Sequence, residues 1–355
     1  MFNQYTNVQL RALKDLSQKK WGTLFTLFDR FGPIPRLLFD TFLPPDQYRW
    51  ENHEVKLQCR IAEYEILLRR KIIKAVKMGP NVVESTEYGV NCSPTIYTTR
   101  PWKMKGYKYV SVRPSLGFAT AEIGRRIAEA TFAISPKDAL RLYDFLLRKG
   151  ETETSAGWIF EARMHQIFQR GGTFKATNLG GSTTITIDLD HRSCKDFSQV
   201  SELGSLLRKQ PESQTINPDI IGGYFKPRHC NLRSLNSVAI ARSATTDKPV
   251  LVLFQMALSK SHPIKAQGFA SIWPELPEEL RDTPPILVFV VPADVATTIS
   301  KQTMVPSGSS TTACNTPDFG KWEQYVLAVS DQILWETSTA KCCNERSIIS
   351  ALTAR

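Results

Sequence analysis

The chain has 355 residues, of which 42% are hydrophobic and 22% charged, so it is not a wholly disordered polypeptide and has room for two or three domains. Its longest apolar run, residues 285–291, is far shorter than the roughly 20 residues of a membrane-spanning helix. The first residues show no apolar segment behind a basic start, so no signal peptide is predicted. Seven cysteines without a C-x-x-C spacing indicate a reducing compartment, without a disulfide framework or structural zinc site. We expect an intracellular location, the nucleus included.

The net charge of +11 comes entirely from the first part of the chain. Residues 1–150 hold 25 Lys and Arg against 14 Asp and Glu, whereas residues 151–355 hold 20 of each. A basic region of this kind favours a polyanionic partner, above all nucleic acid. A solvated basic helix is the alternative that the charge alone leaves open.

The first part, residues 1–150, is predicted to be mostly helical. Its clearest helix covers 51–76, where apolar residues recur at three- and four-residue spacing. A cationic cluster, the candidate nucleic-acid-binding site, lies near the end of this helix: Arg69, Arg70, Lys71 and Lys74. Cations also stabilise a helix C-terminus, which is the structural alternative for this cluster. Short strands and loops are expected over 82–118, and helices over 122–132 and 135–149.

The second part, residues 151–355, is predicted to alternate between helix and strand after a polar joint at 151–154. We expect a helix over 155–169, a hairpin of 173–177 and 183–189, strands at 221–225, 236–242, 250–258 and 286–291, a helix around 265–273 and a last helix over 320–335. Residues 198–208 fit either a helix or a strand. This order predicts an α/β or α+β domain, with a mixed sheet flanked by helices.

Several chemistries are absent from the sequence. It contains no G-x-x-x-x-G-K-[ST] segment and hence no P-loop ATP site, and no G-x-S-x-G, H-E-x-x-H or other metal-ligand spacing of histidines. Two polar residues remain in apolar surroundings: Glu161, one helical turn before His165, and Gln255, inside an apolar strand. Glu161 also fits a surface residue beside the core, and Gln255 fits a hydrogen-bonded core amide.

Five stretches of the second part carry a family resemblance. They are Gly157–Glu161 with His165 and Gly171-Gly172, Tyr224–Pro227 leading to Asn236-Ser237, Leu253–Ala257 running into Ser259–Lys265, Leu287–Pro292, and Trp322–Val326. In this order they resemble the C-terminal domain of Crinkler and retrotransposon-hot-spot type proteins, a branch of the restriction-endonuclease-like PD-(D/E)xK superfamily. Trp21–Arg36 and 95–133 resemble the tail of the P-loop ATPase module that precedes this domain, so residues 1–150 are expected to be a remnant lacking Walker motifs.

The resemblance implies a nuclease that hydrolyses phosphodiesters with Mg²⁺. In that superfamily, carboxylates from one helix and two strands hold the metal, and a lysine stabilises the developing charge. By carry-over, Glu161 is the helix acid, and Asn236 and Gln255 occupy the positions of the two strand acids. These three residues are therefore the expected metal ligands and catalytic residues. Ala257 replaces the lysine of the motif.

These departures weaken a catalytic interpretation. Lys265 or Lys260 could replace the missing lysine, and Asp219 could supply a carboxylate, although its place before Gly222-Gly223 favours a turn. We expect a nuclease-like protein that binds or cleaves DNA or RNA, with a degraded active site and with Mg²⁺ as its cofactor if it is active. One alternative is a non-catalytic, effector-like module that acts through protein partners. Another is a mobile-element product without a selected role.

Overall fold

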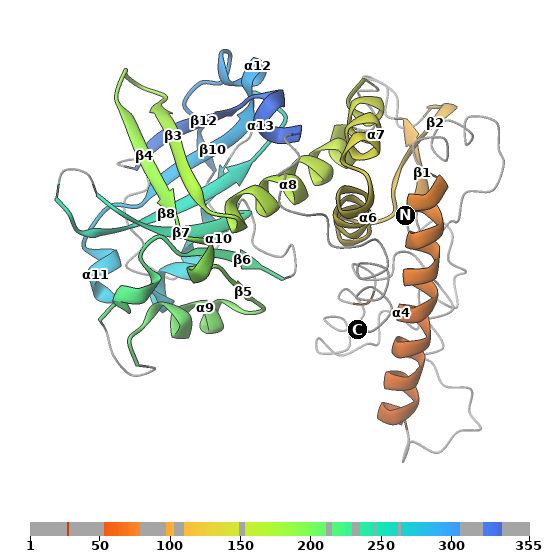
Figure 1. Ribbon diagram of the computed structural model, residues 1–355, viewed down its shortest axis with the longest axis horizontal. Helices are drawn as coiled ribbons and strands as arrows, with labels where there is room; N and C mark the ends of the chain where they lie inside the picture. The colour runs from red at the N-terminus through yellow and green to blue at the C-terminus, as the bar shows by residue number, and fades with distance from the viewer. Residues whose placement is uncertain are drawn as a thin grey trace. The chain divides into compact units, whose positions relative to one another are not determined.

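The computed structural model (Figure 1) describes ten parts of the chain. They are residue 27 and residues 53–78, 97–102, 110–148, 153–210, 215–228, 235–243, 246–261, 264–305 and 322–335. The chain divides into two compact units, residues 1–159 with 339–355 and residues 160–338. The division falls inside helix α8 (Glu153–Gln169), just beyond the polar joint at 151–154. The segment Trp21–Arg36 lies outside the described residues except for Leu27.

Among its described residues, the first unit contains three complete helices, the start of α8 and a pair of strands. The complete helices and the strands are α4 (His53–Met78), β1 (Tyr97–Trp102), β2 (Val110–Phe118), α6 (Ala121–Ile134) and α7 (Pro136–Arg148). The helices expected over 51–76, 122–132 and 135–149 are therefore confirmed. Thr120 caps helix α6, because its hydroxyl accepts a hydrogen bond from the N–H of Ile123.

The second unit is built on one mixed sheet of eight strands. In sheet order they are β4 (Thr184–Leu189), β3 (Gly172–Asn178), β12 (Glu323–Val329), β10 (Ile286–Pro292), β8 (Pro249–Met256), β7 (Ser237–Arg242), β6 (Tyr224–Pro227) and β5 (Lys195–Phe197). Strands β12, β10 and β8 are parallel, β5 is parallel to β6, and the other neighbours are antiparallel. The predicted mixed sheet flanked by helices is confirmed.

Shorter elements connect these strands. They are η5 (His191–Ser193), α9 (Val200–Leu207), η6 (Pro218–Ile220), β9 (Ile264–Lys265), α10 (Ala266–Ile272), η7 (Trp273–Glu275), α11 (Glu278–Arg281), α12 (Ala293–Ala296), β11 (Met304–Val305) and α13 (Asp331–Trp335). In the described part of the chain, no helix combines the length and apolar character needed to cross a membrane.

The helix predicted over 320–335 is wrong for most of its length. Residues 323–329 form strand β12, and only 331–335 are helical. Strand β12 lies between β10 and β3 and buries side chains toward both faces of the sheet, as Tyr325 and Leu327 alternate with Gln324 and Val326. A strand with two buried faces lacks the alternating pattern by which a sequence reveals it.

The two faces of β8 show how helices cover the sheet. On one face, the ring of Phe254 lies 4.8 Å from that of Phe168 in α8 and 6.0 Å from that of Tyr224 in β6. On the other face, Leu253 belongs to the core that contains Phe269 of α10. Helix α8 therefore covers the face toward which Phe254 points, and α10 lies on the opposite side. The candidate site lies on the α8 face.

The end of α8 is fixed by a glycine in a left-handed conformation. Gly171 has a φ of 76°, and its N–H donates to the carbonyl of Phe168. The residue after β4, Asp190, donates its N–H to the carbonyl of Gly222, just before β6. This bond links the end of the β3–β4 hairpin to the opposite half of the sheet, so the sheet is curled.

Candidate functional site

Helix α8 carries the acid that the sequence places at the centre of the site. Glu161 and His165 are one turn apart, and Nε2 of His165 lies 3.4 Å from Oε1 of Glu161. The side chain of His165 is 3% exposed and that of Glu161 is 20% exposed. The imidazole is therefore enclosed, while the carboxylate retains some access to solvent.

Strand β6 adds two groups on the same face of the sheet. The hydroxyl of Tyr224, a fully buried residue, lies 2.6 Å from Nδ1 of His165. Side chains two residues apart on a strand share a face, so Lys226 also lies on the α8 face, where it is only 7% exposed. Lys226 is not among the site residues that the sequence predicts. The available signal was a lysine enclosed between Phe225 and Pro227 in a strand-forming run.

Asn236, just before β7, connects the site to β8. Its Oδ1 accepts a hydrogen bond from the N–H of Met256 at 2.7 Å, and its own N–H donates to the carbonyl of Phe254. Asn236 is also hydrogen-bonded to Glu161. Because an ionised carboxylate can only accept, the NH₂ group of Asn236 is the donor in this bond. The structure thus brings Glu161 and Asn236 into contact.

Gln255 lies on the other face of the sheet. Its neighbour Phe254 points toward α8, and side chains alternate along a strand, so Gln255 shares the α10 face with Leu253 and Ala257. It is 4% exposed. The three residues expected to form one metal site therefore do not meet. The sequence could not reveal this division because β8 is buried on both faces.

The other candidates from the sequence lie away from this contact. Lys260 and Lys265 are exposed on the segment that follows β8. The lysine among the groups that most affect the pKa of Glu161 is Lys226. Asp219 is exposed in η6, where its N–H donates to the side chain of Asn217. This is the turn that the sequence favours for Asp219.

The surroundings of Glu161 keep it ionised. Burial alone would raise the pKa of its carboxyl, but the hydrogen bond and charge of His165, the hydrogen bond from Asn236 and the charge of Lys226 outweigh burial and lower it. Burial raises the pKa of Tyr224 well above its ordinary value, so its phenol stays protonated. The site is therefore one anionic carboxylate in a setting of hydrogen-bond donors.

The ionised carboxylate also sets the direction of the hydrogen bonds. Because Glu161 only accepts, Nε2 of His165 carries the proton that it donates. Its other ring nitrogen, Nδ1, is hydrogen-bonded to the hydroxyl of Tyr224. The chain of bonds runs from Tyr224 through His165 to Glu161, which fixes the carboxylate from the buried side.

These residues do not fit a magnesium ion. Mg²⁺ requires several oxygen ligands, and carboxylates supply most of the charge that holds it. Here one carboxylate faces the N–H of His165, the NH₂ group of Asn236 and the cation of Lys226, all of which compete with a metal. No group of three His, Cys, Asp or Glu side chains suited to a metal occurs among the described residues.

A comparison with known proteins finds no matching family model, no matching curated protein and no matching solved structure.

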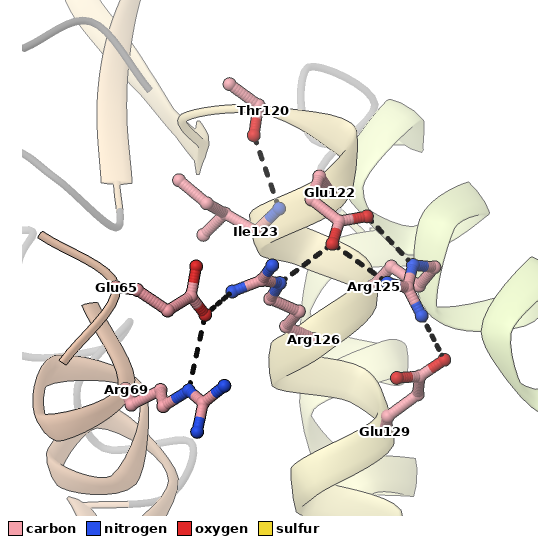
Figure 2. Close-up of polar contacts among 8 residues, drawn as sticks. All are labelled: Glu65, Arg69, Thr120, Glu122, Ile123, Arg125, Arg126 and Glu129. Carbon is pink, nitrogen blue, oxygen red and sulfur yellow. Dashed lines mark hydrogen bonds and ion pairs between the residues drawn. The ribbon is translucent and has the colours of Figure 1, made fainter. Parts of the chain in front are cut away.

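In the first unit, an ion-pair network joins α4 to α6 and includes part of the predicted nucleic-acid-binding cluster (Figure 2). Its charged members are Glu65, Arg69, Glu122, Arg125, Arg126 and Glu129. Oε1 of Glu65 lies 2.6 Å from Nη1 of Arg126 and 3.3 Å from Nε of Arg69. Burial alone would raise the pKa of Glu122, but Arg125 and Arg126 outweigh burial and lower it.

This network divides the predicted cluster into two kinds of residue. Arg69 faces Glu65, so part of its charge is neutralised within the protein. Arg70 and Lys74, one helical turn apart, are exposed, and Lys71 is half-buried. Any phosphate contact from α4 is therefore expected from Arg70 and Lys74 rather than from Arg69.

Arg126→Ala is expected to lower the free energy of unfolding by about 1–2 kcal/mol, because it leaves largely buried carboxylates of α4 and α6 without their shared cation. Urea denaturation measures this loss. Arg141→Ala is the matched control: its side chain is 58% exposed and 3.6 Å from Asp138, so we expect a change below about 0.5 kcal/mol. Equal losses in the two variants would contradict a structural role of the network.

Proposed function

We propose that this chain is a nuclease-like, nucleic-acid-binding protein related to the PD-(D/E)xK superfamily, in which metal-dependent cleavage is lost. The order of elements supports the relationship. The stretches that carry the resemblance fall on α8, β6, β8, β10 and the start of β12. Helix α10 connects the parallel strands β8 and β10, as expected of the crossover in a mixed sheet.

The setting of Glu161 is the observation that carries the proposal. A nuclease of this kind needs several oxygen ligands around a metal at the point where the helix meets the strands. At this point Glu161 accepts hydrogen bonds from Asn236 and His165 and is stabilised by the charge of Lys226. The single acid therefore serves as the acceptor for neighbouring donors. Gln255 adds no ligand because it lies on the α10 face.

The charge of the chain supports nucleic acid as the partner. The net charge of +11 favours a polyanion, and loss of cleavage does not remove binding through phosphates. A protein partner is the competing function, and the salt dependence of binding separates the two. Contacts between lysine or arginine and phosphates give an affinity for nucleic acid that falls steeply with salt.

The first test incubates the purified chain with supercoiled plasmid in Mg²⁺ or Mn²⁺, beside Glu161→Gln. We expect no nicking above background from either protein. Nicking by the intact chain that disappears in Glu161→Gln would overturn the loss of cleavage.

The second test measures binding of fluorescent DNA and RNA oligonucleotides at ~50 mM salt, followed by a salt titration. We expect binding that weakens steeply as salt rises. No binding of either nucleic acid at ~50 mM salt would overturn the nucleic-acid assignment and favour the protein-partner function.

A further inference from the structure

We propose that two segments at the C-terminal end of β8 form the phosphate-contacting surface of the second unit. They are residues 257–261 with 264–265, which follow β8, and residues 297–305, which follow α12. We call them the lysine surface. This inference rests on the proposed nucleic-acid binding and specifies where the contact is made.

The composition of the lysine surface suits a polyanion. The two segments contain Lys260, Lys265 and Lys301 and no aspartate or glutamate. All three lysines are exposed. By contrast, residues 151–355 as a whole carry equal numbers of acidic and basic side chains.

Backbone contacts bring the two segments together. Strands β9 and β11 are parallel, with Ile264 paired to Met304 and Lys265 to Val305. The side-chain nitrogen of Gln302 donates to the carbonyls of Lys260, at 3.1 Å, and Ser300, at 2.7 Å. These two carbonyl oxygens share one donor, so they lie at most about 6 Å apart. The lysines at 260 and 301 are therefore carried by neighbouring stretches of backbone.

The surface is also anchored to the core of the unit. The N–H of Gln302 donates to the side-chain oxygen of Gln324 at 2.7 Å, and the side-chain nitrogen of Gln324 donates to the carbonyl of Gln302 at 3.0 Å. Ile264 and Ile299, one on each segment, are buried in the core. A contact surface held in place in this way loses little conformational entropy on binding.

The remaining side chains favour nucleic acid over a lipid membrane. Exposed hydroxyls of Ser261, Ser300 and Thr303 lie on the same segments as the lysines and suit phosphate oxygens. Binding at a membrane surface usually inserts apolar side chains. None of the large hydrophobic residues exposed in the described part of the chain belongs to the lysine surface.

The test compares two triple variants of the full chain in fluorescence anisotropy with labelled DNA and RNA oligonucleotides. One replaces the surface lysines (Lys260→Gln, Lys265→Gln and Lys301→Gln). The other replaces three exposed lysines elsewhere in the second unit (Lys175→Gln, Lys195→Gln and Lys209→Gln). We expect the first to weaken binding more than about tenfold and to reduce the salt slope, and the second to change affinity by less than about twofold.

The outcomes separate the surface from the proposed function. Equal effects of the two triples, or an unchanged salt slope in the first while the intact chain still binds, overturn the lysine surface and leave the proposed function standing. Failure of the intact chain to bind overturns both. A further arm uses vesicles containing phosphatidylserine. If the first triple loses vesicle binding and keeps its affinity for oligonucleotides, the surface belongs to anionic lipid and the proposal is overturned.

Discussion

Glu161→Ala is expected to lower the free energy of unfolding by about 3 kcal/mol, because it removes the carboxylate that His165, Asn236 and Lys226 face. His165 and Lys226 are almost fully enclosed, so water cannot readily replace the lost acceptor. Glu161→Gln keeps an acceptor oxygen and loses only the charge, so we expect a smaller loss of about 1 kcal/mol. Urea denaturation near pH 7 measures both variants.

Glu279→Ala is the matched control, because Glu279 is an exposed residue in the same unit. Its free energy of unfolding should change by less than about 0.5 kcal/mol. If Glu161→Ala costs no more than this control, the carboxylate does not hold the cluster together.

The pH dependence of stability follows from the lowered pKa of Glu161. A carboxyl whose pKa is lower in the folded than in the unfolded chain stabilises the fold fully above its ordinary value of 4.5. This contribution disappears as the pH falls below that value toward the lower folded pKa. The difference in stability between the intact chain and Glu161→Gln should therefore shrink on acidification. A difference that stays constant would contradict an ionised, stabilised Glu161.

Gly171→Ala is expected to lower the free energy of unfolding by about 3 kcal/mol. Gly171 has a φ of 76°, which costs energy for any residue with a Cβ. A Cβ there would also lie 2.7 Å from the carbonyl oxygen of Leu189 and 2.9 Å from the nitrogen of His191. Both are backbone atoms that cannot turn aside. The substitution therefore separates the end of α8 from the end of β4.

Gly180→Ala provides the control for this glycine. Gly180 lies in the turn of the β3–β4 hairpin, where an added Cβ would meet the side chain of Asn178 at 3.4 Å and no backbone atom nearby. We expect a change below about 1 kcal/mol, measured by thermal or urea denaturation. Similar losses at the two glycines would contradict the tight contact at the end of α8.

The sequence predicts most elements of the second unit because their patterns are local. Helix α8, the β3–β4 hairpin and strands β7, β8 and β10 lie close to their expected ranges. Strand β12 escapes the prediction because its aromatic and apolar residues also recur at helical spacing, and because it buries Gln324 on one face and Tyr325 on the other. The pairing of β12 with β10 and β3 is a non-local property, which periodicity along the chain does not carry.

The candidate site also combines local features, which the sequence predicts, with non-local ones, which it does not. The spacing of Glu161 and His165 on one helical turn is a local signal, and the structure keeps it. The faces to which Asn236 and Gln255 turn depend on strand register and on the bend before β7, and neither is encoded in a short motif. The effect of the Lys226 charge on Glu161 depends on β6 lying on the sheet face that α8 covers, so it appears only in the folded chain.

Paramagnetic broadening by Mn²⁺ tests whether Glu161 accepts hydrogen bonds from its neighbours or binds a metal. A ¹H–¹⁵N spectrum of the full chain, with the side-chain NH₂ of Asn236 assigned, is recorded as Mn²⁺ is added. We expect no selective broadening of the Asn236 side chain, because the carboxylate already accepts hydrogen bonds from Asn236 and His165 and is stabilised by the charge of Lys226. Selective loss of that signal, reversed by excess Mg²⁺, would place a divalent cation at Glu161 and contradict the account.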